Sequence, residues 1–286
     1  MKYIKYFFEC IIIILLFLIF KIFGRKLSVI IGSKIGSIFG PLFRSKKNII
    51  ENILRCFPNK SNVEVKNIIK NMWKYYGMIL SEYMFLKKFR DDKNNTYLHV
   101  EGEEIVNNLK KNTNPVIFVS GHFDNFELMA MQIEKMGIKL AAVYRPLNNI
   151  FLNPIMEYLR KKYLCKKQIK KGKGGIKELL YLFKNGYSIA LMIDQRVSEG
   201  ESINFFNCPA LTTTVPAQFV KKFDCQIVPV FIERQKNLNF KIRFFNPIKF
   251  EKNLEINEIT KKLNHKLEEM IKINPDQWIW SHNRWK

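Results

Sequence analysis

The longest hydrophobic stretch of the chain lies at its N-terminus, where residues 3–23 are nearly all apolar. Its length is about that of one helix crossing the hydrocarbon core of a bilayer. Because basic residues follow it and no small-residue cleavage site does, the pattern predicts an uncleaved membrane anchor over 1–26. A cleaved signal peptide, a helix lying in the membrane interface and a buried helix are the alternatives. The next apolar segment, 27–43, is too interrupted by glycine and proline to predict a second span.

Short apolar runs rich in β-branched and aromatic residues recur along the rest of the chain. Continuous runs are typical of strands buried on both faces of a sheet, and alternation is typical of an edge strand. The expected strands are 97–100, 116–119, 138–143, 187–193, 226–232 and the alternating 240–245. Helices are expected from residue 127 onward and over 176–183, 214–222 and 256–273. This order predicts an α/β core of sheet and covering helices over 96–286.

The first candidate catalytic residue is a histidine that follows directly after an expected strand. The run 116–119 is followed by a turn at Ser120 and Gly121, and then by His122. Glu127 lies five positions further on, a spacing that puts two residues on different faces of one helix, so His122 must lie in the turn. From there its imidazole could meet the Glu127 carboxylate, which would leave the other ring nitrogen free to take a proton from a hydroxyl. Helix amides nearby could stabilise an oxyanion, and a structural histidine is the alternative.

Two further expected strands end in polar side chains. One is followed by Arg145, and the other by Asp194, Gln195 and Arg196. Ligands of open α/β sheets bind at the carboxyl ends of the strands, so these side chains are expected on the same edge as His122. The Arg145 guanidinium is a candidate clamp for phosphate or carboxylate, with a structural ion pair as the alternative.

The charge of the chain points to an anionic partner. Its 286 residues include 48 Lys and Arg against 25 Asp and Glu, a formal net charge of +23. Lipid headgroups, an acidic carrier protein and nucleic acid all fit such a charge. Between Lys21 and Arg90 fifteen basic residues stand against three acids, mixed with aromatic residues at helical spacing. This predicts a basic amphipathic helical region over 27–95 that rests on a membrane, with a solvated basic face on core helices as the alternative.

Three further features of the sequence limit the functions that the protein can have. Residues 160–177 carry nine Lys or Arg and no acid, as a solvated face or a loop that meets an acidic partner would. The tail 275–286 holds three of the four tryptophans and must dock, and we expect it to close the sheet rather than to contact substrate. The five cysteines are scattered without a CxxC pair, which suits a reducing compartment and predicts no zinc site.

Several short motifs are spread over almost the whole chain. They are the N-terminal anchor, Asn48-Ile-Ile-Glu-Asn52 with Cys56-Phe57-Pro58, Ser120-Gly121-His122 through Glu127, Tyr144-Arg145-Pro146-Leu147-Asn148-Asn149, Asp194-Gln195, Phe205-Phe206, and Gln277-Trp278-x-Trp280-x-His282-x-Arg284-Trp285. Together they resemble the bacterial lipid A biosynthesis acyltransferases, the lauroyl and myristoyl transferases related to the glycerophosphate acyltransferase superfamily. The resemblance implies a mixed, largely parallel sheet flanked by helices at the inner membrane.

Carried over to the matching positions, the resemblance makes His122 the general base and Glu127 its orienting partner. It assigns the substrate pocket to Arg145, Asn148, Asp194 and Gln195, and Arg196 is expected to bind substrate beside them. No metal and no cofactor are expected, because a thioester is attacked readily once a positioned imidazole has taken the proton of a hydroxyl. Asn207 and Val215 depart from the pattern of the family and leave the acyl chain length and the acceptor open.

The predicted function is the transfer of a fatty acyl chain from an acyl carrier protein thioester to a hydroxyl of a lipid A precursor. The expected partners are acyl carrier protein, the lipid A precursor and inner-membrane phospholipids. Positive charge is heavier after the single anchor than before it, which predicts that the main domain lies on the cytoplasmic face.

Two alternatives remain open. An acyltransferase acting on glycerophosphate or on a glycolipid mannose is disfavoured by Asp194-Gln195-Arg196, since glycerophosphate enzymes resemble Glu-Gly-Thr-Arg there. A membrane-tethered basic protein that binds nucleic acid or anionic lipid without chemistry would give no role to the order of strand, His122 and helix. We therefore expect no nucleic-acid partner, and salt-dependent DNA binding that survives loss of His122 would contradict this.

Overall fold

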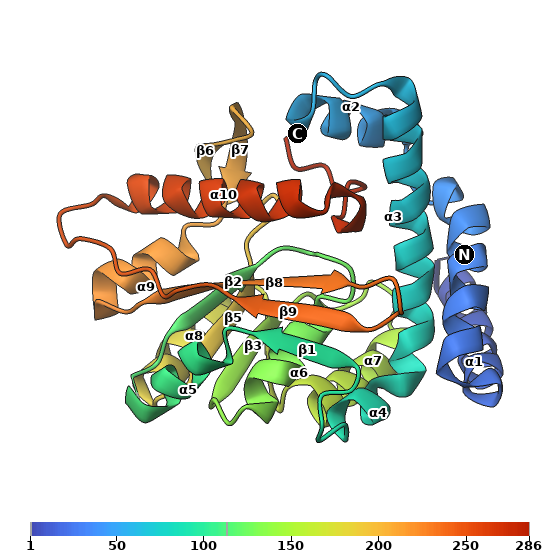
Figure 1. Ribbon diagram of the computed structural model, residues 1–286, viewed down its shortest axis with the longest axis horizontal. Coiled ribbons are helices and arrows are strands. Elements are labelled where there is room, and N and C mark those ends of the chain that lie inside the picture. Colours follow the sequence, from blue (N-terminus) through green and yellow to red (C-terminus); the bar gives the residue numbers. More distant parts are fainter. Residues whose placement is uncertain (1, 113, 286) are drawn as a thin grey trace.

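A mixed sheet forms the centre of the protein (Figure 1), whose computed structural model describes residues 2–112 and 114–285. Its seven strands follow the spatial order β1 (Leu98–Glu101), β9 (Phe240–Phe244), β8 (Ile227–Arg234), β2 (Ile117–Ser120), β5 (Ser188–Met192), β3 (Leu140–Tyr144) and β4 (Lys167–Lys170). The strands from β8 to β4 run parallel to one another, whereas β9 is antiparallel to β8 and carries β1 alongside it. The predicted mixed, largely parallel α/β fold is confirmed.

Helices and one hairpin surround this sheet. The α-helices are α1 (Lys2–Phe39), α2 (Lys46–Cys56), α3 (Asn62–Glu82), α4 (Leu86–Arg90), α5 (Glu103–Asn112), α6 (Glu127–Lys135), α7 (Leu152–Leu159), α8 (Lys173–Lys184), α9 (Val215–Phe223) and α10 (Ile256–Ile273). Shorter turns are η1 (Gly40–Leu42), η2 (Tyr83–Phe85), the π-helical η3 (Arg160–Leu164) and η4 (Pro275–Gln277), and the hairpin joins β6 (Glu201–Phe205) to β7 (Cys208–Thr212). In Figure 1, α10 lies above the sheet and α5, α6 and α8 lie below it.

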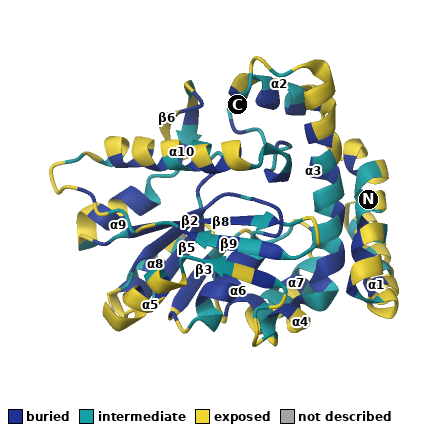
Figure 2. Cartoon of the chain, viewed as in Figure 1, coloured by how far each residue is buried: buried dark blue, intermediate teal, exposed yellow. Residues whose placement is uncertain are grey.

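All six expected strands are present, and the central ones have apolar runs that are buried on both faces. All four residues of β2 are buried, and β5 and β8 are buried over most of their length (Figure 2). Strand β4 was not expected, since residues 160–177 were interpreted as a solvated face or a loop. Only Ile169 of β4 is buried and its neighbours are polar, so an edge strand here carries too little apolar pattern to be detected from sequence.

The carboxyl ends of the parallel strands face helix α3. Figure 1 shows β8 pointing toward this helix, and β2, β5 and β3 run in the same direction. Ser61 caps α3 in a reciprocal pair with Glu64, which explains where the helix begins. On the far side of α3 lies α1, so α3 separates most of the predicted anchor from the edge of the sheet.

Helix α1 is bent into two arms at Gly24. This residue has φ 68° and ψ 168°, a left-handed conformation that glycine adopts without a steric penalty. Among the described residues, the segment Lys2–Leu42 is the one helix long and apolar enough to cross a membrane, with a mean hydropathy of 2.6 in its most apolar window. Many of its hydrophobic side chains are exposed, as Figure 2 shows, which fits a membrane anchor. The division of the chain at 26 and 95 stays a prediction.

The second arm of α1 packs directly against α3 through glycines. Gly32 and Gly36 of α1 face Gly77 of α3, and a Cβ added at Gly77 would lie 1.8 Å from the Gly32 carbonyl oxygen. Two helices can approach so closely only where neither carries a side chain. The glycines that interrupt the segment 27–43 therefore form a helix contact, which the sequence had shown only as breaks.

Replacing Gly77 by alanine should destabilise the protein by about 1–3 kcal/mol, because the new methyl group meets backbone atoms that cannot rotate away. Thermal unfolding of the detergent-solubilised protein measures the effect. Gly174→Ala in α8 is the matched control, since nothing lies within 4 Å of the added Cβ there. An unchanged unfolding midpoint for Gly77→Ala would contradict the close contact of the two helices.

Candidate active site

His122 lies in the turn between β2 and α6, as predicted. Its side chain is 17% exposed, so the ring is accessible from one side only. The preceding residue, Gly121, packs so tightly that an added Cβ would lie 3.0 Å from both Leu267 and Phe123. The backbone of the turn is thus packed closely against Leu267 of α10.

Asp194 is the carboxylate that binds His122. The register of the parallel strands pairs Ser120 of β2 with Met192 of β5, and His122 and Asp194 each follow two positions later. His122 Nδ1 lies 2.7 Å from Asp194 Oδ1, and the His122 amide donates to Oδ2 at 2.7 Å. Trp278 Nε1 also donates to Oδ2, at 2.8 Å. Three donors therefore converge on one buried carboxylate.

These contacts determine the ionisation of Asp194 and the tautomer of the His122 ring. Burial raises the pKa of Asp194, but the interactions with His122 and with the Trp278 indole outweigh it and lower the pKa to about 2. Asp194 is therefore ionised at neutral pH and accepts a hydrogen bond from Nδ1–H of the imidazole. The proton of the neutral ring then sits on Nδ1, and Nε2 carries the lone pair that a general base needs.

His122 lines a small, largely apolar pocket. The amide Nε2 of Gln195 lies 3.3 Å from His122 Nε2, and the Phe126 ring packs edge-on at 4.4 Å between ring centroids. The adjoining cavity has a volume of about 30 Å³, room for a small group such as a hydroxyl. Its wall comes from α3, the His122 turn and the tail, with Met72, Tyr75, Tyr76, Ile79, Asp124, Phe126, Asp276, Gln277, Trp278 and Ile279.

The expected contact between Glu127 and His122 is not formed among the described residues. Glu127 instead accepts three hydrogen bonds from Arg160, of 2.9 Å from Nε to Oε2, 3.2 Å from Nε to Oε1 and 2.5 Å from Nη2 to Oε1, and one from the Tyr83 hydroxyl. The carboxylate at the start of α6 is directed toward η3 and η2, because the Arg160 guanidinium neutralises it there. Whether Glu127 contributes to catalysis stays a prediction, but Asp194 occupies the place beside the ring.

Three amides of the turn before α6 are engaged within the protein. His122 N donates to Asp194, Phe123 N donates to the Gly121 carbonyl and Asp124 N donates to the Gln277 carbonyl. None of these three N–H groups points toward the pocket. The donor that remains closest to His122 Nε2 is the Gln195 side chain.

The other predicted pocket residues lie further from His122. Arg145 and Asn148 are exposed and do not line the cavity, although both follow β3 on the expected edge. The neighbour Asn149 is buried and donates to the Tyr6 carbonyl of α1 at 2.8 Å, so this loop contacts the predicted anchor. Arg196 is half-buried, and its amide donates to His282 Nε2 at 3.0 Å.

The C-terminal tail supplies residues that the motif around His122 did not indicate. Trp278 binds Asp194, and its backbone pairs with Phe123 in an isolated bridge. His282 accepts from the Arg196 amide. The tail docks as predicted, but it also forms part of the site. The density of tryptophans in the tail is the sequence feature that could have indicated a role in the site, because a buried indole N–H needs an acceptor.

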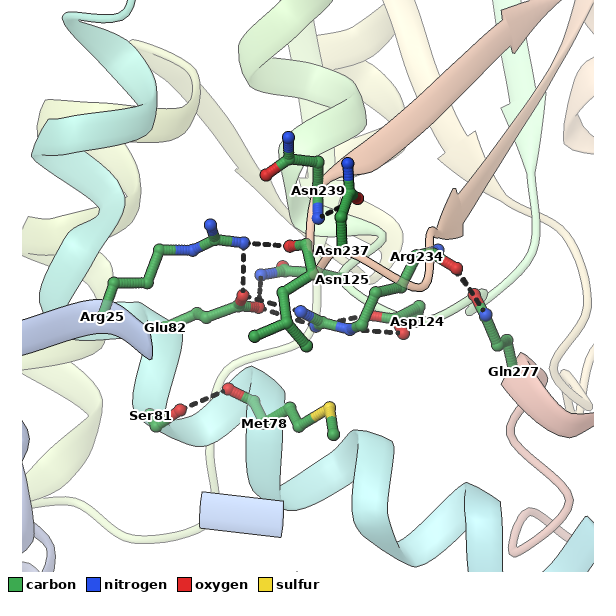
Figure 3. A network of polar contacts seen from close by, with 11 residues as sticks. Arg25, Met78, Ser81, Glu82, Asp124, Asn125, Arg234, Asn237, Asn239 and Gln277 are labelled. Atoms are coloured by element: carbon green, nitrogen blue, oxygen red, sulfur yellow. Dashed lines mark hydrogen bonds and ion pairs between the residues drawn. The ribbon is translucent and has the colours of Figure 1, made fainter. Parts of the chain in front are cut away.

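A buried ion network holds the turn after His122 (Figure 3). Arg234 of β8 donates to Asp124 at 2.7 Å and 3.0 Å, and to both carboxylate oxygens of Glu82 at 2.8 Å. Glu82 also accepts from Asn125 at 3.0 Å and from Arg25 of α1 at 3.4 Å. Asp124 has φ 34°, so these contacts hold a strained backbone conformation beside the site.

The same network includes Arg25, one of the basic residues that follow the apolar run at the N-terminus. The Arg25 guanidinium is buried, donates to the Leu238 carbonyl and stacks over Phe89 at 5.0 Å. The bend at Gly24 turns this side chain inward against α3. The predicted anchor is therefore joined to the catalytic turn through two carboxylates and two guanidinium groups.

His282 gives the site a dependence on pH. Burial lowers its pKa from 6.5 to about 4, so it is neutral in the folded protein. Since the unfolded chain takes up the proton at higher pH, the free energy of unfolding should fall as pH drops from about 6.5 toward 4. In thermal unfolding between pH 7 and 4, His282→Gln should weaken this decline, whereas His99→Gln on the exposed face of β1 should not. Equal pH slopes for His282→Gln and the unmodified chain would contradict the assignment.

In the described residues no three His, Cys, Asp or Glu side chains gather as a metal site would require. A histidine oriented by a carboxylate at the carboxyl edge of a largely parallel sheet defines a class of enzymes that activate a hydroxyl by removing its proton. The protein belongs, more narrowly, to the bacterial lipid A biosynthesis acyltransferase family, whose model matches residues 1–286. It is an acyltransferase of lipid A biosynthesis.

Curated relatives agree at low identity and high coverage. A lipid A biosynthesis myristoyltransferase of Escherichia coli (strain K12) is 22% identical over 252 residues, which cover 87% of this chain and 77% of the relative. A lipid A biosynthesis palmitoleoyltransferase of the same organism is 23% identical over 263 residues, covering 90% and 84%. A solved 1-acyl-sn-glycerophosphate acyltransferase from Thermotoga maritima aligns with a TM-score of 0.43 and 12% identity, over 88% of this chain and 99% of that one.

Proposed function

We propose that the protein transfers a fatty acyl chain from an acyl carrier protein thioester to a hydroxyl of a lipid A precursor. The observation that carries this proposal is the His122–Asp194 pair beside helix α3, in which the carboxylate holds Nδ1 of an imidazole that lines an apolar pocket. The hydrophobic anchor on the far side of α3 and the net charge of +23 suit a lipid acceptor and an acidic donor protein. The inner membrane and its cytoplasmic face are the location we propose.

In this reaction, His122 Nε2 takes the proton of the acceptor hydroxyl while the oxygen attacks the thioester carbonyl carbon. Asp194 stabilises the imidazolium that forms, through the hydrogen bond at Nδ1. The tetrahedral intermediate carries a negative oxygen, to which the Gln195 amide can donate from its position 3.3 Å from the ring. Collapse breaks the carbon–sulfur bond, and the imidazolium returns its proton to the departing thiolate.

Other predicted residues are given supporting roles in the proposal. Glu127 acts through Arg160, because their bidentate ion pair fixes the start of α6 next to the His122 turn. Arg145 and Arg196 are cations at the carboxyl edge, suited to phosphate groups of the acceptor or of the donor's carrier. Asn148 lies on the same loop as Arg145 and is proposed to bind substrate with it.

An acceptor panel tests the proposal. The detergent-purified protein is given radiolabelled acyl carrier protein thioester together with a lipid A precursor, glycerol 3-phosphate or a mannose glycolipid. The radiolabelled acyl chain should be transferred to the lipid A precursor, and the labelled product should be resistant to conditions that cleave thioesters. Transfer to either other acceptor in its place would overturn the choice of substrate. Graded donor chain lengths, analysed by mass spectrometry of the product, identify the preferred acyl chain.

A further inference from the structure

A second pocket lies outside the active site, where the end of α1, the start of α2 and one face of α3 meet. Its volume is about 240 Å³, much larger than the cavity at His122. The lining residues are Ser37, Pro41, Arg44, Lys46, Ile49, Lys66, Ile69, Lys70 and Trp73. In Figure 1 this region lies at the upper end of α3, next to α2.

The rim of the pocket is strongly basic. Four of its lining residues are cations and no lining residue is acidic: Arg44, Lys46, Lys66 and Lys70. Among the salt bridges and side-chain hydrogen bonds of residues 2–112 and 114–285, none involves these four side chains. Helix α2 also begins here, and its first turn contains no acid to offset the positive end of its dipole. The pocket therefore concentrates positive charge that the described protein does not neutralise.

The floor of the pocket is apolar. Ile49, Ile69 and Trp73 are buried in the core, and their side chains contribute to the lining. A basic rim over an apolar floor matches an amphipathic ligand, with an anionic group held by the cations and a hydrocarbon part in contact below. A fully hydrated small anion would make no contact with the apolar floor.

Exposed hydrophobic residues adjoin the pocket at the end of α1. Leu42 is 79% exposed and Phe43 is 74% exposed, immediately before the lining residue Arg44. Ile38 and Phe39, on the last turn of the helix, are exposed as well. Because such side chains are stable in the acyl region of a bilayer, the cations beside them stand at headgroup level.

We propose that this pocket binds the phosphate headgroup of an anionic membrane lipid, with the glycerol and upper acyl chain against its apolar floor. The proposal rests on the pocket and the exposed apolar side chains and does not depend on the acyl transfer proposed above. A bound lipid would also support the wall of the active site, since Trp73 lines this pocket while Tyr76, whose ring centroid lies 5.5 Å away, lines the cavity at His122.

Native mass spectrometry of the full chain in non-ionic detergent tests the inference. Titration with phosphatidylglycerol should give a bound lipid, and phosphatidylcholine should bind at least about tenfold more weakly, as expected when a charge-assisted contact is lost. Lys66→Gln with Lys70→Gln should weaken phosphatidylglycerol binding by a similar factor. Lys261→Gln with Lys262→Gln, on the exposed face of α10, removes the same charge elsewhere and should leave binding unchanged.

Each contrary outcome overturns the proposal. Equal binding of phosphatidylglycerol by the two double variants would place the lipid elsewhere on the protein, and equal binding of the two lipids would remove the role of charge. Displacement of phosphatidylglycerol by millimolar inorganic phosphate would make this a site for a free anion. Protection of Lys66 and Lys70 from acetylation by apo acyl carrier protein, with none by phosphatidylglycerol, would make it a protein-docking surface. Matching unfolding midpoints confirm that both double variants are folded.

Discussion

His122→Ala is expected to lower the rate of acyl transfer by on the order of 10²-fold or more, because it removes the group that we propose takes the proton of the acceptor hydroxyl. The ring is placed to act as a base: Nδ1 is bound to Asp194, which leaves Nε2 as the acceptor, and His122 lines the pocket. Transfer of radiolabel from acyl carrier protein thioester to lipid A precursor, measured at saturating substrate, gives the rate. The loss should appear in kcat, because the imidazole acts on the reacting atoms rather than on binding.

His99→Ala is the matched control, since His99 is exposed on β1 at the far edge of the sheet and should leave the rate unchanged. The unfolding midpoint of His122→Ala shows whether the turn remains folded. A folded His122→Ala protein with the full transfer rate would remove His122 from the mechanism, and the proposed chemistry with it.

Asp194→Asn should lower the rate by about 10²–10⁴-fold, the range seen when an orienting carboxylate is lost. Two donors, the His122 amide and the Trp278 indole, point at Oδ2, so the new amide must keep its oxygen there. Its NH2 group then faces His122 Nδ1 and favours the tautomer with the proton on Nε2. In that tautomer Nε2 cannot accept the proton of a hydroxyl.

Glu127→Gln tests which of two carboxylates, Glu127 or Asp194, orients His122. The contacts of Glu127 with Arg160 and Tyr83 predict a loss of stability, about 3–5 kcal/mol if the buried ion pair is fully broken, and a smaller loss of rate in the protein that stays folded. The pH–rate profile should keep its shape in Glu127→Gln and change in Asp194→Asn. A deep loss of rate in Glu127→Gln, with Asp194→Asn near the unmodified rate, would return the orienting role to Glu127.

The strands and the place of the histidine followed from local sequence pattern. A buried strand needs an unbroken apolar run, and such runs at 116–119 and 187–193 correspond to β2 and β5. The turn at Ser120 and Gly121 then placed His122 at the carboxyl edge. These features depend on residues that are neighbours in the chain, which is why the sequence was sufficient to predict them.

The partner of His122 depended on contacts between distant parts of the chain. Asp194 lies 72 positions from His122, and only the register of β2 against β5 brings the two together. Glu127 is close to His122 in sequence, but its carboxylate binds Arg160 of η3 instead. No local sequence pattern predicts that pairing. Trp278 likewise reaches Asp194 only because the tail folds back over the sheet.

The sequence by itself thus determined the class of fold, the apolar anchor and the histidine at the edge of the sheet, since hydrophobic periodicity and turn residues act over a few positions. The tertiary structure decided which carboxylate holds the imidazole, how Arg25 of the anchor joins the buried network, and where four cations gather around one pocket. These are pairings between side chains far apart in the chain, and their geometry is set by strand register and helix packing rather than by local composition.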